Sequence, residues 1–187
     1  MTHRPDSVFP PATVGEAPRT AAGLFVDCLE NEGVEFVFGI PGEETLDVSE
    51  ALDRSQLITF VPTRHEQGAA FMADAYGRLT GRPGVCLATL GPGATNLATG
   101  VGDATLDHAP LVALTGQTGL AGMHKETHQF IDVVDMLRPM TKWNTRIHHP
   151  RMVAEAVRKA FSVAAAEKPG ATHLELPEDV METVTAG

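Results

Sequence analysis

The fold class can be read from Val85-Cys86-Leu87-Ala88-Thr89, a short apolar run that Leu90-Gly91-Pro92-Gly93-Ala94 follows at once. A continuous run of this length, closed by glycine and proline, is typical of a strand buried on both faces of a sheet. Helical periodicity begins near residue 94 and continues to about residue 106. The order of strand, turn and helix predicts one step of an α/β fold.

The same alternation extends in both directions along the chain. We predict helices at 20–33, 44–52, 66–79, 94–106 and 151–166, and strands at 36–40, 58–61, 85–89, 111–115 and 172–176. Thr20 is the expected N-cap of the first helix, and Gly33 is expected to end it. Strands separated by helices of this length imply right-handed crossovers. The sequence therefore predicts a doubly wound, mainly parallel sheet with helices on both faces.

Composition limits the classes of function. The 187 residues include 24 acidic and 14 basic side chains, and the formal net charge is -10. Such a chain repels phosphate backbones and anionic lipid, so we expect no nucleic-acid partner. No apolar stretch approaches the roughly 18 residues of a membrane span, and no signal peptide is evident. Cys28 and Cys86 lack metal-ligand spacing and are predicted to be packed thiols, which fits a cytoplasmic location.

The first residues differ from the rest in composition. Residues 1–18 contain four prolines and few large apolar side chains, so burial of these residues would not offset the conformational entropy lost on folding. We predict a flexible leader over 1–18 and one domain over 19–187.

Ligands of open α/β sheets bind outside the carboxyl ends of the strands. Four predicted strands end there in loops rich in glycine, proline and polar residues, at 39–43, 63–66, 90–96 and 115–117. The loop at 91–96 superficially resembles a dinucleotide fingerprint, but Asn96 replaces the third glycine, which argues against a nicotinamide site. No metal site is expected, because His124 and His128 lack a zinc-protease pattern and His65 lacks further ligands.

Glu66 is the strongest catalytic candidate. An isolated glutamate at a helix start is usually a solvated side chain that the helix dipole favours. Glu66, however, follows an apolar strand and precedes Gln67-Gly68-Ala69-Ala70, a turn of small residues that allows another surface to approach. A partly desolvated carboxyl at this edge can donate or accept a proton near neutral pH.

Six motifs in order resemble the acetolactate synthase family of thiamine diphosphate (ThDP) enzymes. They are Phe38-Gly39-Ile40-Pro41-Gly42, Arg64-His65-Glu66-Gln67-Gly68, Ala75-Tyr76-Gly77-Arg78, Gly81-Arg82-Pro83-Gly84-Val85, Gly91-Pro92-Gly93-Ala94-Thr95-Asn96 and Thr115-Gly116-Gln117. The resemblance runs from about residue 20 to residue 180. It implies the N-terminal, pyrimidine-binding domain of such an enzyme, with a flavodoxin-like three-layer architecture.

The resemblance also implies roles for individual residues. Glu66 would hydrogen-bond N1′ of the aminopyrimidine and so activate the cofactor, which decarboxylates pyruvate and condenses the resulting enamine with a second 2-oxo acid. Five other residues would line the cofactor or substrate. Pro41 and Gly42 would flank the reactive centre, Pro92 and Asn96 would shape the pyrimidine pocket, and Gln129 would lie near the substrate.

Further parts of the enzyme are implied but not found in this sequence. The family binds diphosphate and Mg²⁺ through a separate domain, and its central domain holds FAD in many members. Its active sites form between two subunits, so a homodimer or tetramer is implied. Two alternatives remain at this stage: another ThDP-dependent 2-oxo acid decarboxylase or carboligase, and a non-catalytic module that kept the fold.

Overall fold

The computed structural model describes residues 19–125 and 128–185, so the predicted leader at 1–18 lies outside the described residues. Its centre is a six-stranded sheet in the order β3-β2-β4-β5-β7-β6, and every neighbouring pair in it is parallel. The strands are β2 (Phe36–Gly39), β3 (Thr59–Pro62), β4 (Gly84–Ala88), β5 (Leu111–Gln117), β6 (Trp143–Arg146) and β7 (Ala171–Pro177). The predicted parallel α/β sheet is confirmed.

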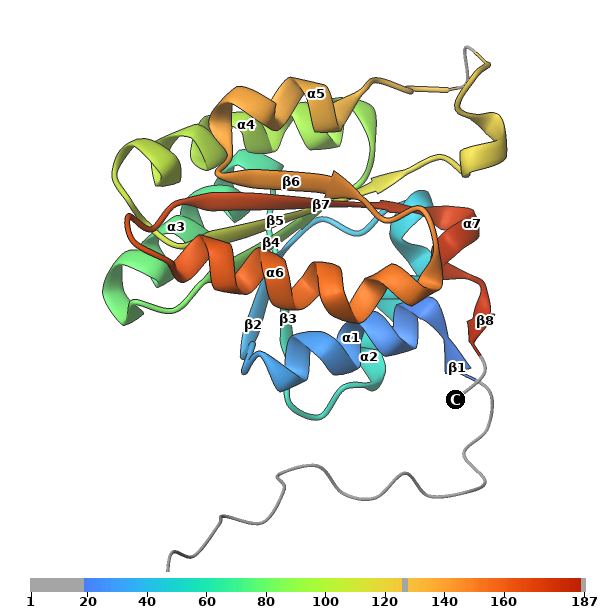
Figure 1. The fold of residues 1–187 in the computed structure, drawn as a ribbon, viewed down its shortest axis with the longest axis horizontal. Helices are drawn as coiled ribbons and strands as arrows, with labels where there is room; N and C mark the ends of the chain where they lie inside the picture. The colour runs from blue at the N-terminus through green and yellow to red at the C-terminus, as the bar shows by residue number, and fades with distance from the viewer. Residues whose placement is uncertain (1–18, 126–127, 186–187) are drawn as a thin grey trace, which may run out of the picture.

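Helices cover both faces of this sheet, which makes three layers (Figure 1). One face packs against α1 (Ala21–Asn31), α2 (Leu46–Arg54) and α6 (Val153–Ala165), and the other against α3 (Glu66–Thr80), α4 (Gly91–Leu106) and α5 (Val133–Leu137). Strand β4 shows why an unbroken apolar run was needed. Val85 and Leu87 point into the first layer, while Cys86 and Ala88 point into the second.

Short elements complete the described chain. Strands β1 (Arg19–Thr20) and β8 (Val184–Thr185) pair antiparallel, so the two ends of the described domain lie side by side (Figure 1). The remaining elements are the helix α7 (Glu178–Met181) and the 3₁₀ turns η1 (Glu43–Thr45), η2 (Leu120–Gly122), η3 (Arg138–Met140) and η4 (Pro150–Met152).

Most predicted boundaries differ from the structure by one to three residues, and two differences matter for the site. Helix α4 begins at Gly91 rather than at Ala94, because Pro92 fits a first helical turn, where its missing N–H would have no partner. Strand β5 continues to Gln117 rather than ending at Thr115. The sequence prediction also missed β6 and α5, two short elements without a clear apolar period. By contrast, the Thr20 cap is confirmed, since its side chain accepts the Gly23 N–H at 3.2 Å.

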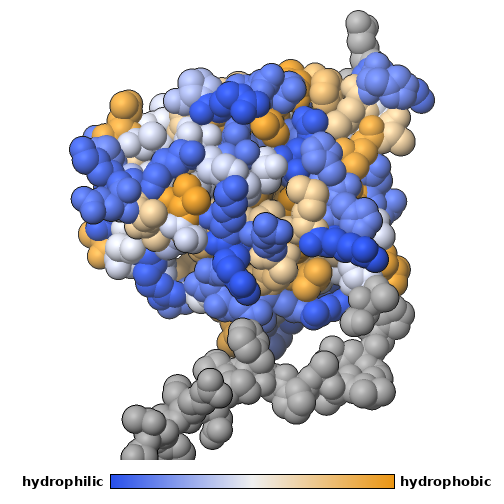
Figure 2. Space-filling view, viewed as in Figure 1, coloured by the Kyte–Doolittle hydropathy of each residue, from blue (hydrophilic) through white to orange (hydrophobic). Residues whose placement is uncertain are grey.

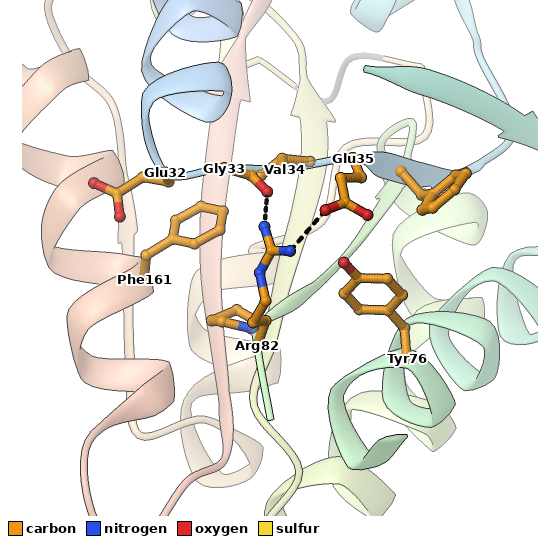
Figure 3. Close-up of a pocket in the computed structure, with 9 residues that line it drawn as sticks. Glu32, Gly33, Val34, Glu35, Tyr76, Arg82 and Phe161 are labelled. Atoms are coloured by element: carbon orange, nitrogen blue, oxygen red, sulfur yellow. Dashed lines mark hydrogen bonds and ion pairs between the residues drawn. The ribbon is translucent and has the colours of Figure 1, made fainter. Parts of the chain in front are cut away.

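The amino edge of the sheet is held by Arg82. As Figure 3 shows, its guanidinium reaches between the start of β2 and the end of α1 and donates to Glu35 Oε1 at 2.7 Å and to the Gly33 carbonyl. The hollow beside it holds little more than a water molecule and lies opposite the edge that carries the candidate site. We interpret the Arg82 contacts as structural.

The outer surface has no broad apolar band on the side that α6 and α1 form, where hydrophilic and apolar side chains are interspersed (Figure 2). Within residues 19–125 and 128–185, no helix combines the length and the apolar character needed to cross a membrane.

Helices α3 and α4 approach closely because small residues line their contact. A Cβ built on Gly100 of α4 would lie 2.6 Å from the Cβ of Ala70 in α3. Arg78 then ties the two helices, donating at 2.6–2.8 Å to Asp74 in its own helix, to Asp103 of α4 and to Asp107, the C-cap of α4.

Two glycines of α3 should respond oppositely to alanine. A Cβ on Gly77 would lie 2.4 Å from the Pro110 carbonyl oxygen, so Gly77→Ala should lower the free energy of unfolding by about 1–3 kcal/mol. No atom lies within 4 Å of a Cβ on Gly68, so Gly68→Ala should raise it by about 0.5–1 kcal/mol through helix propensity. Urea unfolding of the 187-residue chain measures both, and equal effects would contradict the described packing.

Candidate functional site

The candidate site lies where the carboxyl ends of the parallel strands meet. Strands β2, β3, β4 and β5 all end there. Residues 39–43 and 63–66 lie at the ends of β2 and β3 as expected, whereas residues 91–96 already belong to α4 and residues 115–117 are the last of β5. In Figure 1 this edge is on the right, where the yellow segment leaves β5. Because the sheet contains only parallel pairs, these loops share one edge.

Glu66 is the first residue of α3 and is half-buried. Its predecessor His65 caps the helix, since His65 Nδ1 accepts the Gln67 N–H at 3.2 Å. Asn96 of α4 donates from Nδ2 to Glu66 Oε2 at 3.0 Å. This hydrogen bond fixes the carboxylate, and the other oxygen, Oε1, lies 3.4 Å from where a Cβ on Gly93 would be.

The loop after β2 is fastened to the end of β4. Thr89 Oγ1 donates to Glu44 Oε2 at 2.9 Å, and a Cβ on Gly42 would lie 2.5 Å from Thr89 Cγ2. Only glycine fits at position 42, so the adjacent Pro41, which is exposed, is held at a fixed height above the sheet. The sequence analysis did not identify Glu44 or Thr89 as part of this edge.

Gln129 reaches the same edge from a distant part of the chain. Its carbonyl oxygen and Cβ would lie 2.3 and 2.8 Å from a Cβ on Gly91, and Gly91 has a left-handed φ of 52°. Both the close approach and the φ require glycine at this position. Gln129 itself is exposed and has a φ of 56°.

The structure therefore brings some predicted residues into contact and leaves others apart. Glu66 and Asn96 form a pair, whereas Gln129 packs on the start of α4. Pro92 is exposed on the first turn of that helix, next to Gly91. Within 19–125 and 128–185, no three His, Cys, Asp or Glu side chains converge in a way that could hold a metal ion.

A group of buried polar residues lies beside this edge and escaped the sequence analysis. Glu175 of β7 is fully buried and accepts from Gln117 Nε2 at 3.0 Å and from Arg146 Nε of β6. Burial raises the pKa of Glu175, and the Arg146 guanidinium opposes this shift. Thr115 of β5 and His173 of β7 lie next to these residues, one step farther from the carboxyl edge. We call the set the polar ladder: Thr115, Gln117, Arg146, His173 and Glu175.

His173 is the titratable residue of the polar ladder that lies farthest from the carboxyl edge. Its Nε2 lies 2.8 Å from Thr115 Oγ1, while Nδ1 has no hydrogen-bond partner among the described residues. Burial, with a smaller contribution from Arg146, lowers the pKa of His173 to about 3. The imidazole is thus neutral at physiological pH.

Together, the parallel doubly wound sheet, the close-packed loops and the half-buried Glu66–Asn96 pair define an α/β domain whose carboxyl edge has the features of a small-molecule site. Residues 19–136 match the family described as thiamine pyrophosphate enzyme, N-terminal TPP binding domain, and the chain belongs to this family.

Comparison with individual proteins gives the same result. The chain is 47% identical to acetolactate synthase of Bacillus subtilis (strain 168) over 88% of its residues and 29% of the relative's. It is 41% identical to acetolactate synthase 2, chloroplastic, of Nicotiana tabacum over 89% of its residues and 25% of the relative's. It is 42% identical to the probable acetolactate synthase large subunit of Methanocaldococcus jannaschii over 86% of its residues. The resemblance found in the six motifs is confirmed, and the chain spans just over a quarter of the length of these relatives.

Acid should destabilise the domain through His173. Below pH 6.5 the unfolded chain binds a proton at this imidazole that the folded chain does not bind, so the free energy of unfolding falls as the pH drops toward 3. From pH 7.5 to pH 5 the loss from this residue should be about 2 kcal/mol. His173→Gln should abolish that part of the pH dependence in urea unfolding.

The matched control is His148→Gln, which removes an exposed histidine. Equal acid sensitivity in the original chain and in His173→Gln would contradict a neutral, buried His173.

Proposed function

We propose that the chain is the pyrimidine-binding domain, over residues 19–187, of a ThDP-dependent acetolactate synthase-like carboligase. This enzyme would decarboxylate pyruvate and join the two-carbon unit to a second 2-oxo acid. The observation that carries the proposal is the hydrogen bond from Asn96 to Glu66 at the carboxyl edge of the sheet. It fixes one carboxylate oxygen and leaves the other directed along the first turn of α4.

The residues at this edge suit an aminopyrimidine. A flat ring needs close access, and two glycines lie on this side: a Cβ on Gly93 would be 3.4 Å from Glu66 Oε1, and no atom lies within 4 Å of a Cβ on Gly68. A ring nitrogen needs a hydrogen-bonding partner, and the half-buried Glu66 carboxyl offers an oxygen for that contact. The chain's own residues therefore fit this part of ThDP.

ThDP, when bound, supplies the electron sink for decarboxylation. In our proposal Glu66 shares a proton with N1′ of the pyrimidine, and Asn96 orients the carboxyl for this contact. Pro41 and Gly42 flank the reactive centre, because the Thr89 contact fixes their height above the sheet. Pro92 shapes the wall of the pocket at the start of α4, and Gln129 faces the 2-oxo acid.

The same proposal covers the parts of the enzyme outside this chain. The described edge offers no phosphate-binding motif and no cluster of metal ligands among its described residues, so the diphosphate and Mg²⁺ would bind through a separate domain. A central domain with FAD would belong to the full-length protein, and we propose a cytoplasmic location for it.

A second copy of the chain is the proposed partner. Helix α3 presents an exposed apolar face, defined by Gly68, Phe71, Met72, Ala75 and Leu79 at helical spacing. Phe71 is 37% exposed, Met72 41% and Leu79 87%, which is unusual for three large apolar residues on one helix. Self-association through this face would form a homodimer or a tetramer and would cover the residues next to Glu66.

Glu66→Gln should remove the proposed proton relay. In the full-length reading frame that carries these residues, with ThDP and Mg²⁺, the variant should form acetolactate from pyruvate at least roughly a hundredfold more slowly. Glu43→Gln, an exposed change at the same edge, is the control and should keep activity.

Full activity of Glu66→Gln would overturn the role of Glu66. If none of the three proteins forms acetolactate, the assignment of the ThDP-binding fold still holds, but the assignment of pyruvate as the substrate fails. Product from another 2-oxo acid would then favour a different decarboxylase or carboligase, and no turnover at all would favour a non-catalytic module.

Phe71→Glu should weaken self-association. A charge in the apolar α3 face would be desolvated in the proposed contact, so the weight-average mass in sedimentation velocity should fall toward that of one chain. Glu155→Lys, a change on α6 at the opposite layer, is the control. Sedimentation of the original protein as a monomer at high concentration would contradict the proposed partner.

A further inference from the structure

The chain between β5 and α5 is tied to the sheet at both of its ends. At the first end the Gly119 N–H donates to Glu178 Oε1 at 3.1 Å. At the other end Gln117 Nε2 donates to the Ile131 carbonyl at 3.1 Å, and Arg146 Nη2 lies 3.7 Å from Asp132 Oδ1. The second pair of ties comes from the polar ladder.

These ties act next to Gln129. Ile131 and Asp132 follow it by two and three residues, and Gln129 packs its backbone on Gly91 at the start of α4. A residue with a φ of 56° gains nothing from local backbone preference, so its position must come from contacts on either side. The polar ladder provides those contacts on the C-terminal side.

The ladder is hard to explain by stability alone. The Glu175 side chain is fully buried and that of Arg146 is only 17% exposed. Removing two such charges from water costs free energy that their attraction does not reliably repay, and apolar residues of similar volume often serve equally well. Arg146 Nη2 also lacks a hydrogen-bond partner among the described residues, yet it points toward Asp132.

The contacts form a series in which each side chain orients the next. Gln117 holds Glu175 through one oxygen, and Arg146 holds the other. With both heads fixed, Gln117 also donates to the Ile131 carbonyl, and Arg146 Nη2 lies on the side of Asp132. Asn144 adds a parallel contact from β6, donating to the Val134 carbonyl of α5 at 2.5 Å.

We propose that Gln117, Arg146 and Glu175 are positioning residues that hold Gln129 against the start of α4, acting through Ile131 and Asp132. The inference rests on the proposed function, because it takes Gln129 as the residue that faces the 2-oxo acid. The ladder touches neither the cofactor nor the substrate, and it sets how well the substrate is bound.

A purely structural role is the rival explanation, and two variants separate it from positioning. Glu175→Gln keeps the shape but leaves Arg146 without its countercharge. The double variant Arg146→Met with Glu175→Leu removes both charges and refills the volume, so it should recover much of the stability that the single change loses. The double variant also removes the tie from Arg146 to Asp132, whereas Glu175→Gln keeps Arg146 but removes the carboxylate that fixes its head.

The first readout is hydrogen exchange of the peptide at residues 128–132, measured by mass spectrometry on the full-length protein. We expect its amides to exchange at least about tenfold faster in both variants, while the peptide at 21–31 stays unchanged. Arg138→Gln, which removes an exposed ion pair with Asp135 in α5, is the matched control and should exchange as the original does.

The second readout is the kinetics of acetolactate formation. Loss of substrate positioning should raise the KM for pyruvate at least about tenfold and change kcat by less than about threefold, in the double variant as in the single one. The proposal would be overturned if the double variant regained slow exchange and a low KM along with its stability. An unchanged KM in an active Glu175→Gln enzyme would also overturn it. If the original protein forms no acetolactate, the proposed function fails, and slow exchange at 128–132 in both variants would then overturn the ladder's role independently.

Discussion

Parallel pairing of all six central strands is the constraint on which the rest of this structure depends. A parallel pair cannot be closed by a tight hairpin, so each connection must cross a face of the sheet, and the helices that result bury both faces. The strands must then be apolar on both sides, as β4 is. All carboxyl ends also fall on one edge, so residues far apart in the sequence, such as Glu66 and Asn96, meet there without any long-range design beyond strand direction.

Close packing converts that edge into a defined site. Backbone approaches of the kind seen at Gly42 and Gly91 leave no room for a side chain, and each one fixes a loop relative to its neighbour. Loop β2–η1 is set by Thr89, and the segment that carries Gln129 is set by α4. Glu66 in turn has a capped helix start beneath it and an amide beside it. The catalytic candidate is therefore held by the start of α3 and by Asn96 of α4.

Much of this arrangement could be predicted from the sequence, for identifiable physical reasons. The run Val85–Thr89 has one interpretation as a buried strand, and Thr20 and Gly33 mark helix ends by their own chemistry. The missed parts lack such signals. Strand β6 is short and polar, and its pairing with β7 depends on tertiary context. In β7, His173 and Glu175 alternate with Leu174 and Leu176, a pattern that normally indicates a solvent-facing side, yet α5 covers them. Hydrogen bonds between distant side chains, such as Thr89 to Glu44, leave no periodic trace.

The β1–β8 pair bears on how such a domain can be inherited. Its two short strands bring the entrance and the exit of the described domain to one point on the surface, next to α7. A unit with adjacent ends can be spliced into, or joined with, another gene product without stretching either partner. Recombination at this junction leaves the six-stranded sheet intact. A domain of this kind can therefore stand in different surrounding proteins while its own packing stays the same.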